Sequence, residues 1–456
     1  MSLIFDETQY TVKTLEEDGQ KLVYRAFEGI PYVSSPTSPE LQQLSIFVPE
    51  AFYEGKSING YDLKTAPIFF PNTVGGYRPG PLLQPGRTNK GIINAAFYAL
   101  LHGYVVVSAG ARGRGMQDAS GKYIGCAPSV ICDLKAAVRY LRFNIERIPG
   151  DTDKIITNGT SAGGASSSLL GCTGNHPDYE ELLSQMGAAP AGDHVFASSC
   201  YCPITNLDHA DMAYEWEFNG LNDYVRWTPD GTADTRRMTD EQQALSDQLK
   251  VLFPAYVNSL NLRDIHTHPL TLDDNGNGSF KEYVKEYVIA SCNNALQKGT
   301  DLSCHTWITM DGGQVTDVDF HRYIAFRTRM KTTPAFDNVG MGTAENELFG
   351  SPDTFERHFT GFGLANSTVN GTLAEAQQIK MMNPMYYIDD PAAQKAQHFR
   401  IRHGAVDRDT SLAIPVILTT KLQNAGIDAE LAFPWGIPHA GDYDLEELFA
   451  WIDSIC

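Results

Sequence analysis

Concentrated positive charge is what this sequence most clearly lacks. The 456 residues carry a formal net charge of −20, and they contain no dense cluster of lysine or arginine. Nucleic acids and anionic membrane surfaces are bound through concentrated positive charge. We therefore expect neither of them as a partner. The net negative charge does not argue against a small neutral ligand.

Long apolar runs are also missing. None approaches the roughly 20 residues that a membrane-spanning helix needs. The opening residues Met1–Glu7 lack the basic segment and apolar stretch of a secretory signal peptide. We expect a cytoplasmic protein, or a secreted one if a leader has been removed. The sequence gives no indication of the oligomeric state.

Motifs for metals and cofactors are equally scarce. The eight cysteines form no C-x-x-C pair and show no zinc-ligand spacing; they stand at positions 126, 132, 172, 200, 202, 292, 304 and 456. Scattered cysteines of this kind are typical of free thiols in a reducing compartment. The glycine-rich segment Ala109–Gly115 opens no helix with the spacing of a dinucleotide site. We expect no cofactor and no metal in the catalytic machinery.

One segment does resemble half of a calcium loop. Asp273–Ser279 has oxygen-bearing side chains at alternate positions and a glycine at the sixth. The twelfth position is Val284, where a calcium loop supplies a bidentate glutamate. An ordinary turn of Asx and Gly residues is the favoured interpretation, and a calcium site is the alternative.

The pattern of apolar residues predicts an α/β protein. Three β-rich runs joined by turn residues predict an antiparallel meander: Tyr10–Leu15, Lys21–Ile30 and Leu44–Val48. Strands then alternate with helices, which favours a parallel, doubly wound sheet. The predicted strands are Ala66–Phe70, Tyr104–Ser108, a run from Lys154, His194–Ser198, His398–Arg402 and Asp428–Phe433. The predicted helices are Asn94–His102, Val130–Asn144, a segment after Ser161, Ser411–Gly426 and Leu445–Ile455.

The alternation stops for almost two hundred residues. Residues 206–397 are polar, rich in aromatic side chains and helical only in patches. A segment of this length is too long for a loop. We expect an inserted lid domain there, with residues 1–205 and 398–456 forming the catalytic domain.

A nucleophile motif lies at the centre of the α/β pattern. Gly159-Thr160-Ser161-Ala162-Gly163 fits G-x-S-x-G, with a strand before it and a helix after it. This elbow holds the serine in a strained conformation, and its neighbours must be very small. The motif predicts an α/β-hydrolase fold with Ser161 as the nucleophile. The oxyanion donors expected are the N–H groups of Ala162 and Gly76, with Gly75 as the alternative to Gly76.

The other catalytic groups are expected after the last two strands. In this fold the order along the chain is Ser, then Asp, then His. His439 stands in a small-residue loop before the final helix and is the predicted base, with His403 as the alternative. Asp407 and Asp409 are both candidates for the acid that orients it, and spacing gives Asp407 only a small preference.

At these residues the sequence resembles the bacterial tannases over nearly its whole length. The motifs are Gly159–Gly164, Arg402–Ser411, Lys331–Asn338, Gly342–Phe349 and Gly436–Gly441. The resemblance implies a serine esterase that cleaves galloyl esters such as gallate esters and hydrolysable tannins through an acyl-enzyme. It assigns the triad to Ser161, Asp407 and His439, and so decides between the two aspartates.

The same resemblance assigns the substrate contacts. It implies that Lys331, Glu345 and Asp409 bind the galloyl hydroxyls and that Ile204 packs against the ring. Two departures stand out. Ala344 replaces a proline expected before the lid glutamate, and Thr160 and Pro438 replace the paired cysteines of fungal and feruloyl-esterase relatives. The alternatives are a feruloyl or general carboxylesterase and, from another class, a catalytically inactive binding module.

Overall fold

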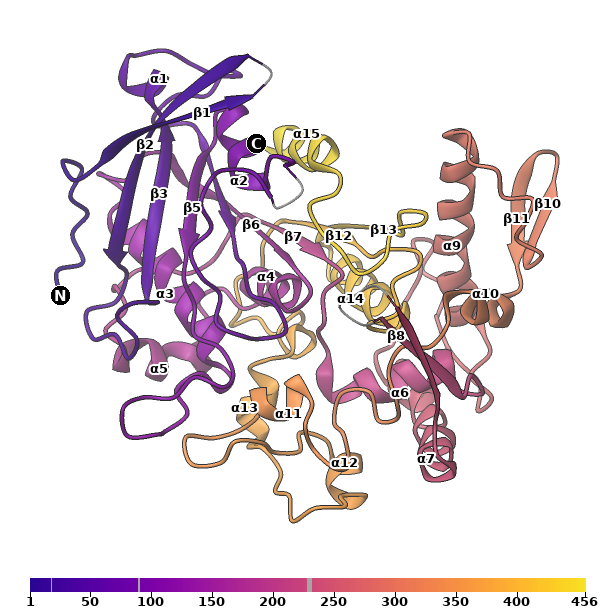
Figure 1. Cartoon of the computed structure of the whole chain (residues 1–456). Coiled ribbons are helices and arrows are strands. Elements are labelled where there is room, and N and C mark those ends of the chain that lie inside the picture. Colours follow the sequence, from indigo (N-terminus) through magenta and orange to yellow (C-terminus); the bar gives the residue numbers. More distant parts are fainter. Residues whose placement is uncertain (18, 89–90, 228–231) are drawn as a thin grey trace.

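The computed structural model describes residues 1–17, 19–88, 91–227 and 232–456. In these ranges the principal sheet has nine strands in the order β1-β2-β3-β5-β4-β6-β7-β12-β13 (Figure 1). Their bounds are β1 Thr11–Glu17, β2 Gln20–Pro31, β3 Gln43–Pro49, β4 Pro67–Pro71, β5 Val105–Ala109, β6 Asp151–Thr160, β7 Ala197–Tyr201, β12 His398–Arg402 and β13 Asp428–Ala432.

Strand directions follow the predicted division. Strands β1, β2 and β3 pair antiparallel, and β3 also pairs antiparallel with β5. From β5 to β13 every pairing is parallel. The central strands β4, β5 and β7 are buried along their whole length, as expected for strands covered on both faces. Both the meander and the parallel sheet are confirmed.

Helices cover the two faces of the sheet. One core cluster packs α3, α4 and α14 against one face, and a second packs α2 and α15 against the other. Their bounds are α2 Ala95–Leu101, α3 Ser129–Phe143, α4 Ala162–Cys172, α14 Ala413–Asn424 and α15 Leu445–Ile455. Shorter helical segments complete this part: α1 Glu50–Tyr53, η1 Pro177–Tyr179 and α5 Glu180–Gln185. The arrangement is an α/β-hydrolase fold.

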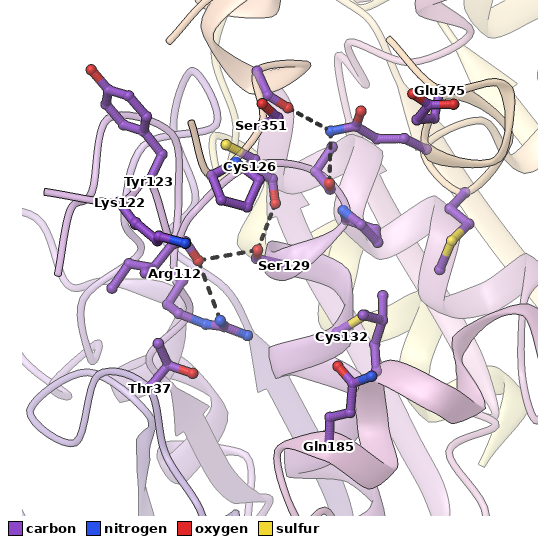
Figure 2. A pocket seen from close by; sticks show the side chains of 18 of the residues that line it. Thr37, Arg112, Lys122, Tyr123, Cys126, Ser129, Cys132, Gln185, Ser351 and Glu375 are labelled. Atoms are coloured by element: carbon purple, nitrogen blue, oxygen red, sulfur yellow. Dashed lines mark hydrogen bonds between the residues drawn. The ribbon is translucent and has the colours of Figure 1, made fainter. Parts of the chain in front are cut away.

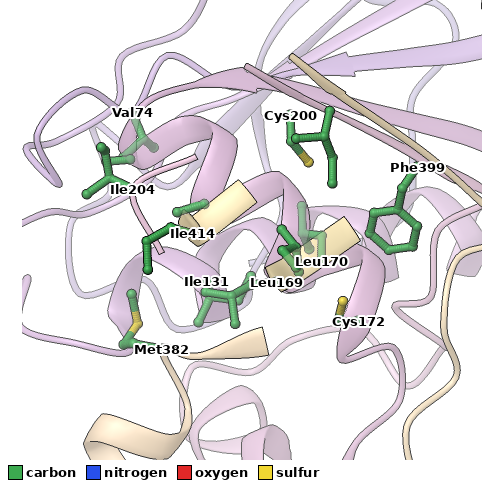
Figure 3. Packing of buried hydrophobic residues seen from close by; sticks show 14 of the residues in the cluster. Val74, Ile131, Leu169, Leu170, Cys172, Cys200, Ile204, Met382, Phe399 and Ile414 are labelled. Atoms are coloured by element: carbon green, nitrogen blue, oxygen red, sulfur yellow. The ribbon is translucent and has the colours of Figure 1, made fainter. Parts of the chain in front are cut away.

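The helix after the elbow is fully buried. Leu169 and Leu170 of α4 lie among side chains from several elements, including Ile131 of α3 and Phe399 of β12 (Figure 3). All eleven residues of α4 are buried, and the first seven, Ala162–Ser168, all have small side chains. This packing fixes the start of α4, where Ser161 lies.

Residues 206–397 add no described strand to the principal sheet. They form helices and two separate two-stranded ribbons, and in Figure 1 they extend beside β13 and beneath α4. The bounds are α6 Leu207–Phe218, β8 Asp223–Trp227, β9 Ala233–Arg237, α7 Asp240–Lys250, α8 Phe253–Ser259, α9 Ser279–Gln297, β10 Ile308–Asp311, β11 Gln314–Val318, α10 Phe320–Arg327, α11 Ala344–Leu348, α12 Gly361–Ala365, α13 Ala376–Lys380 and η2 Pro384–Tyr386. No helix in the described ranges has the length and apolar character needed to cross a membrane.

Candidate active site

Ser161 has the backbone conformation of a nucleophile elbow. It lies between β6 and α4 with φ 64° and ψ −122°, a region that a serine enters only when its surroundings force it there. The flanking glycines are needed for close packing. A Cβ on Gly159 would lie 2.3 Å from the Gly163 carbonyl oxygen, and one on Gly163 would lie 2.8 Å from the Val74 carbonyl oxygen. Neither position can accept a side chain without moving backbone.

Asn72 holds the elbow from the neighbouring strand. Its Nδ2 donates to the carbonyl oxygens of Gly163 at 3.0 Å and Asn158 at 3.1 Å. The residue follows β4 directly and has no part in the G-x-S-x-G pattern, so the sequence analysis missed it. Its position at the end of a buried strand was the available signal.

The two candidate aspartates face different partners. Asp407 is fully buried, and its Oδ2 accepts a hydrogen bond from Nδ1 of His439 at 2.7 Å. Its Oδ1 accepts from the backbone N–H of Asp409 at 2.8 Å. The Asp409 carboxylate lies 3.9 Å from the His439 ring and 3.1 Å from Nζ of Lys331. Asp407 is therefore placed to orient the His439 imidazole, whereas the Asp409 carboxylate pairs with Lys331.

Charge on Asp407 is stabilised by its neighbours. Burial acts to raise its pKa, but His403, His439 and the hydrogen bonds it accepts together hold the pKa well below the usual range. For His439, burial acts to lower the pKa, while the Asp407 charge and hydrogen bond outweigh burial and raise it. The pair thus favours a positively charged imidazole, the form that a general base adopts after taking a proton.

His403 does not occupy the position of a base. It is fully buried, and burial lowers its pKa to about 4, which keeps the ring neutral. Its Nδ1 lies 3.8 Å from Oδ2 of Asp407, and its ring packs against Phe433. In the described ranges neither ring nitrogen has a hydrogen-bond partner.

A cavity of about 400 Å³ joins the elbow to residues 331–345. Seven predicted site residues line it: Gly76, Ser161, Ala162, Ile204, Lys331, Glu345 and Asp409. Arg226, Asn338 and Met341 also line it and were not predicted. Side chains more than 160 residues apart in sequence therefore meet at one site.

The cavity wall formed by Lys331, Glu345 and Asp409 is polar; Glu345 is buried, whereas Lys331 and Asp409 are partly exposed. The Glu345 side chain is 8% exposed, and burial raises its pKa despite the nearby Lys331 charge. For Lys331, burial acts to lower the pKa, but Asp409 and Glu345 outweigh it, so the pKa is raised and the ammonium stays charged. Two carboxyl groups and one ammonium are thus available to neighbouring hydroxyl groups.

Solved structures of known proteins resemble this chain over its full length. The native tannin acyl hydrolase from Lactobacillus plantarum is 48% identical, with a TM-score of 0.96, and the match covers 100% of this chain and 99% of that one. The tannase of Fusobacterium nucleatum is 45% identical with the same TM-score and coverage. The chain belongs to the bacterial tannase family.

Three other matches agree with this family. A tannin acyl hydrolase in complex with ethyl gallate is 48% identical, with a TM-score of 0.95 and coverage of 100% of this chain and 99% of that one. The BD-FAE family model matches residues 88–229. Esterase LipC of Mycobacterium tuberculosis is 40% identical over 58 residues, which are 13% of this chain and 14% of LipC. This tannase family member is a carboxylic ester hydrolase.

Arg114 links the candidate oxyanion glycine of this tannase to helix α11. Its Nε donates to the Gly76 carbonyl oxygen at 2.6 Å, and its backbone N–H donates to the Tyr77 carbonyl oxygen at 2.8 Å. Its Nη1 pairs with Glu347, two residues after Glu345. Gly76 itself has φ 53°, a conformation that favours glycine. The sequence analysis noted the loop that carries Arg114 only as a discounted nucleotide site.

A second cavity of about 790 Å³ lies apart from these groups (Figure 2). None of the predicted site residues lines it. Several of its polar groups are already engaged: Arg112 pairs with Asp133, and Gln378 donates to the carbonyl oxygens of Ala127 and Gly350. This cavity is larger than the one that Ser161 lines, so cavity size alone does not identify the candidate active site.

The possible calcium loop of this tannase binds its own backbone. Oδ1 of Asp273 accepts hydrogen bonds from the N–H groups of Asn275 and Asn277, both at 2.9 Å. The Asn277 side-chain oxygen accepts from Lys281. These contacts form an Asx turn, and they use carboxylate and amide oxygens that a calcium ion would need.

Proposed function

We propose that this enzyme hydrolyses galloyl and closely related hydroxybenzoyl esters, and that Ser161, His439 and Asp407 are its catalytic triad. The observation that carries the proposal is the shared cavity: Ser161 lines it together with Lys331, Glu345 and Asp409. The substrate class is a small aromatic ester.

Recognition rests on the three hydroxyl groups of the acyl ring. The carboxylates of Asp409 and Glu345 accept hydrogen bonds from two of them, and Lys331 donates to an adjacent hydroxyl oxygen. Ile204 supplies one apolar wall, and Met341 takes part in lining the cavity near Ala344. A ring without hydroxyls would leave the buried Glu345 carboxyl without its hydroxyl partner and would lose the contacts to Lys331 and Asp409, which disfavours it by roughly 10⁴-fold or more in sites built to bind hydroxyls.

The chemical step follows from the same placement. His439 takes the Ser161 proton as the hydroxyl oxygen attacks the ester carbonyl, and it then gives that proton to the leaving alcohol. The N–H groups of Ala162 and Gly76 stabilise the oxyanion, and each such donor contributes about 3 kcal/mol in comparable enzymes. Water activated by His439 then attacks the acyl-enzyme and releases the acid.

Residues 206–397 act as a lid in this proposal, on a catalytic domain made of residues 1–205 and 398–456. The lid supplies Lys331 and Glu345, while the catalytic domain supplies Ser161 and Asp409. Substrate bound between the two parts is shielded from water, which strengthens the polar contacts to the ring.

The second candidate is a feruloyl esterase. The BD-FAE match over residues 88–229 favours it, because that region includes the elbow. The two carboxyl groups and the ammonium that line the cavity argue for a ring with several hydroxyls instead. An inactive binding module is disfavoured because Ser161, His439 and Asp407 are all retained.

The test is hydrolysis of methyl gallate, methyl ferulate and methyl benzoate by the wild type and by Ser161→Ala. The proposal predicts a strong preference for the gallate and loss of turnover in the variant. Comparable rates on all three esters would be consistent with the triad, but they would show that Lys331, Glu345 and Asp409 do not select for ring hydroxyls. Absence of turnover together with no labelling by a fluorophosphonate probe would favour the binding module.

A further inference from the structure

A buried thiol lies against the catalytic histidine and has no role in the mechanism above. Cys202 follows β7 with φ 35° and is fully buried. Its Sγ lies 4.0 Å from Nε2 of His439 and 3.4 Å from the carbonyl oxygen of Ala440. Nε2 is the atom that must take the Ser161 proton, so the thiol is beside the reacting end of the ring.

The spacing of these two atoms fits one metal ion. Zinc binds thiolate sulfur at about 2.3 Å and imidazole nitrogen at about 2.0 Å. Two such ligands on one ion are about 3.5 Å apart at a tetrahedral angle and at most about 4.3 Å apart when collinear with it. The 4.0 Å between Sγ and Nε2 lies between these values. Both atoms can therefore bind the same ion with little movement.

Asp407 completes the arrangement from the other side of the ring. Within the part of the chain that the structure describes, Cys202, Asp407 and His439 form the one group of three or more His, Cys, Asp or Glu residues whose ligand atoms all lie within 4.8 Å of one another. Asp407 accepts from Nδ1, which leaves the Nε2 lone pair directed away from it. Carboxylates hold metal-binding histidines in this way and raise their basicity.

We propose that Cys202 Sγ and His439 Nε2 form an inhibitory site for a thiophilic divalent cation such as Zn²⁺ or Cd²⁺. As the metal–sulfur and metal–nitrogen bonds form, the S–H bond of Cys202 and the Nε2–H bond of the charged His439 ring break, and both protons leave to solvent with no change of oxidation state. Water fills the remaining coordination positions. The bound ion occupies the Nε2 lone pair, so His439 cannot accept the Ser161 proton. The inhibitory effect rests on the proposed triad, whereas metal binding does not.

Cadmium titration tests binding without reference to activity. The readout is the ultraviolet charge-transfer absorption of the Cd²⁺–thiolate bond, measured in a background where the exposed Cys304 and Cys456 are serine. We expect tight binding in this background and in the same background with Ser161→Ala. Cys202→Ala should weaken binding at least about tenfold, as losses at metal sites commonly do. The control Cys126→Ala, in the cavity of Figure 2, should leave it unchanged.

Inhibition by Zn²⁺ supplies the functional readout. The wild-type enzyme should lose ester hydrolysis on adding Zn²⁺ and regain it with a chelator. The Zn²⁺ concentration that halves the rate should rise at least about tenfold in Cys202→Ala. Cys202→Ser serves as a second variant if the alanine protein is poorly folded by circular dichroism. Unchanged Cd²⁺ absorption and unchanged Zn²⁺ sensitivity without Cys202 would overturn the proposal, even in an enzyme that prefers another ester.

Discussion

At the scale of single residues, Asp407 and Asp409 show what a sequence cannot decide. They lie two positions apart on one loop, and both have acidic side chains suited to a triad. The backbone turn between them directs Asp407 to His439 and Asp409 to Lys331. Spacing gave no means of seeing that turn, and only the family resemblance separated the two residues. Asn72 and Arg114 were missed because no motif records their contacts, which include the carbonyl oxygens of Gly163 and Gly76.

Replacing each aspartate should separate the two roles. Asp407→Asn removes the charge that orients His439, and we expect kcat to fall by roughly 10⁴-fold on every ester tested. Asp409→Asn removes one hydrogen bond to a ring hydroxyl, worth about 1.5–3 kcal/mol, and should mainly slow methyl gallate. Steady-state kinetics on methyl gallate and methyl benzoate measure both effects. A uniform loss in Asp409→Asn would contradict the assignment.

The pH profile should report the His439 environment. In the proposed triad the neutral imidazole of His439 is the base, so kcat/KM should fall as pH drops through its pKa. Because Asp407 raises that pKa, the acid limb should lie above the usual histidine value of about 6.5. Removing the Asp407 charge should lower the His439 pKa. The fall in the remaining activity at acid pH should therefore occur at a lower pH. A limb that stays in place in Asp407→Asn would show that another group controls it.

At the scale of elements, a regular pattern of apolar residues predicted the strand and helix bounds most reliably. Strand β12 and helix α15 have the predicted bounds, since each combines a clear apolar pattern with strong boundary residues. Strand β7 begins at Ala197 and ends at Tyr201, three residues later at both ends than predicted. The two serines and two cysteines that follow Ala197 have a weak apolar pattern. In the sheet the Ser198 hydroxyl donates to the Ser167 carbonyl oxygen of α4, which makes burial possible.

Helix α11 and the loop after β4 are joined by Arg114, so that side chain should affect catalysis. Arg114→Met removes the hydrogen bond to Gly76 and the pair with Glu347. We expect a fall in kcat of about tenfold or more with a smaller change in KM, because the oxyanion donor loses its support. Glu347→Gln should cost less, since it keeps the contact with Gly76. Steady-state kinetics on methyl gallate measure the kcat and KM changes. Equal changes in KM for both variants, with kcat unchanged, would instead place Arg114 in substrate binding.

At the scale of the whole molecule, buried charges connect residues 206–397 to the loop after β12. Glu217 of α6 pairs with Arg327 of α10, and both side chains are fully buried. Glu217 also accepts hydrogen bonds from the Ser411 hydroxyl and the Leu412 N–H, while Arg327 donates to the Asp407 carbonyl oxygen. The sequence suggested an insertion by its composition, but its internal elements depend on such tertiary contacts and could not be predicted from local patterns.

Breaking this connection should destabilise the protein. Glu217→Gln leaves Arg327 buried without its counter-charge, and loss of one partner of a buried pair typically costs about 3–5 kcal/mol. Denaturant unfolding followed by tryptophan fluorescence measures the change. The exposed pair Lys56–Glu54 is the control, and Glu54→Gln should change stability by less than about 1 kcal/mol. Similar small changes in both variants would mean that the buried pair contributes little.

The central claim is that one cavity joins the triad to a site selective for ring hydroxyls. The most direct measurement is the ratio of kcat/KM for methyl gallate to that for methyl benzoate, in the wild type and in Lys331→Met. A high wild-type ratio should fall by roughly 10-fold or more in the variant, because a charged hydrogen bond to the ring is lost, while the benzoate rate is retained. Equal loss on both esters, or a wild-type ratio near one, would contradict the claim.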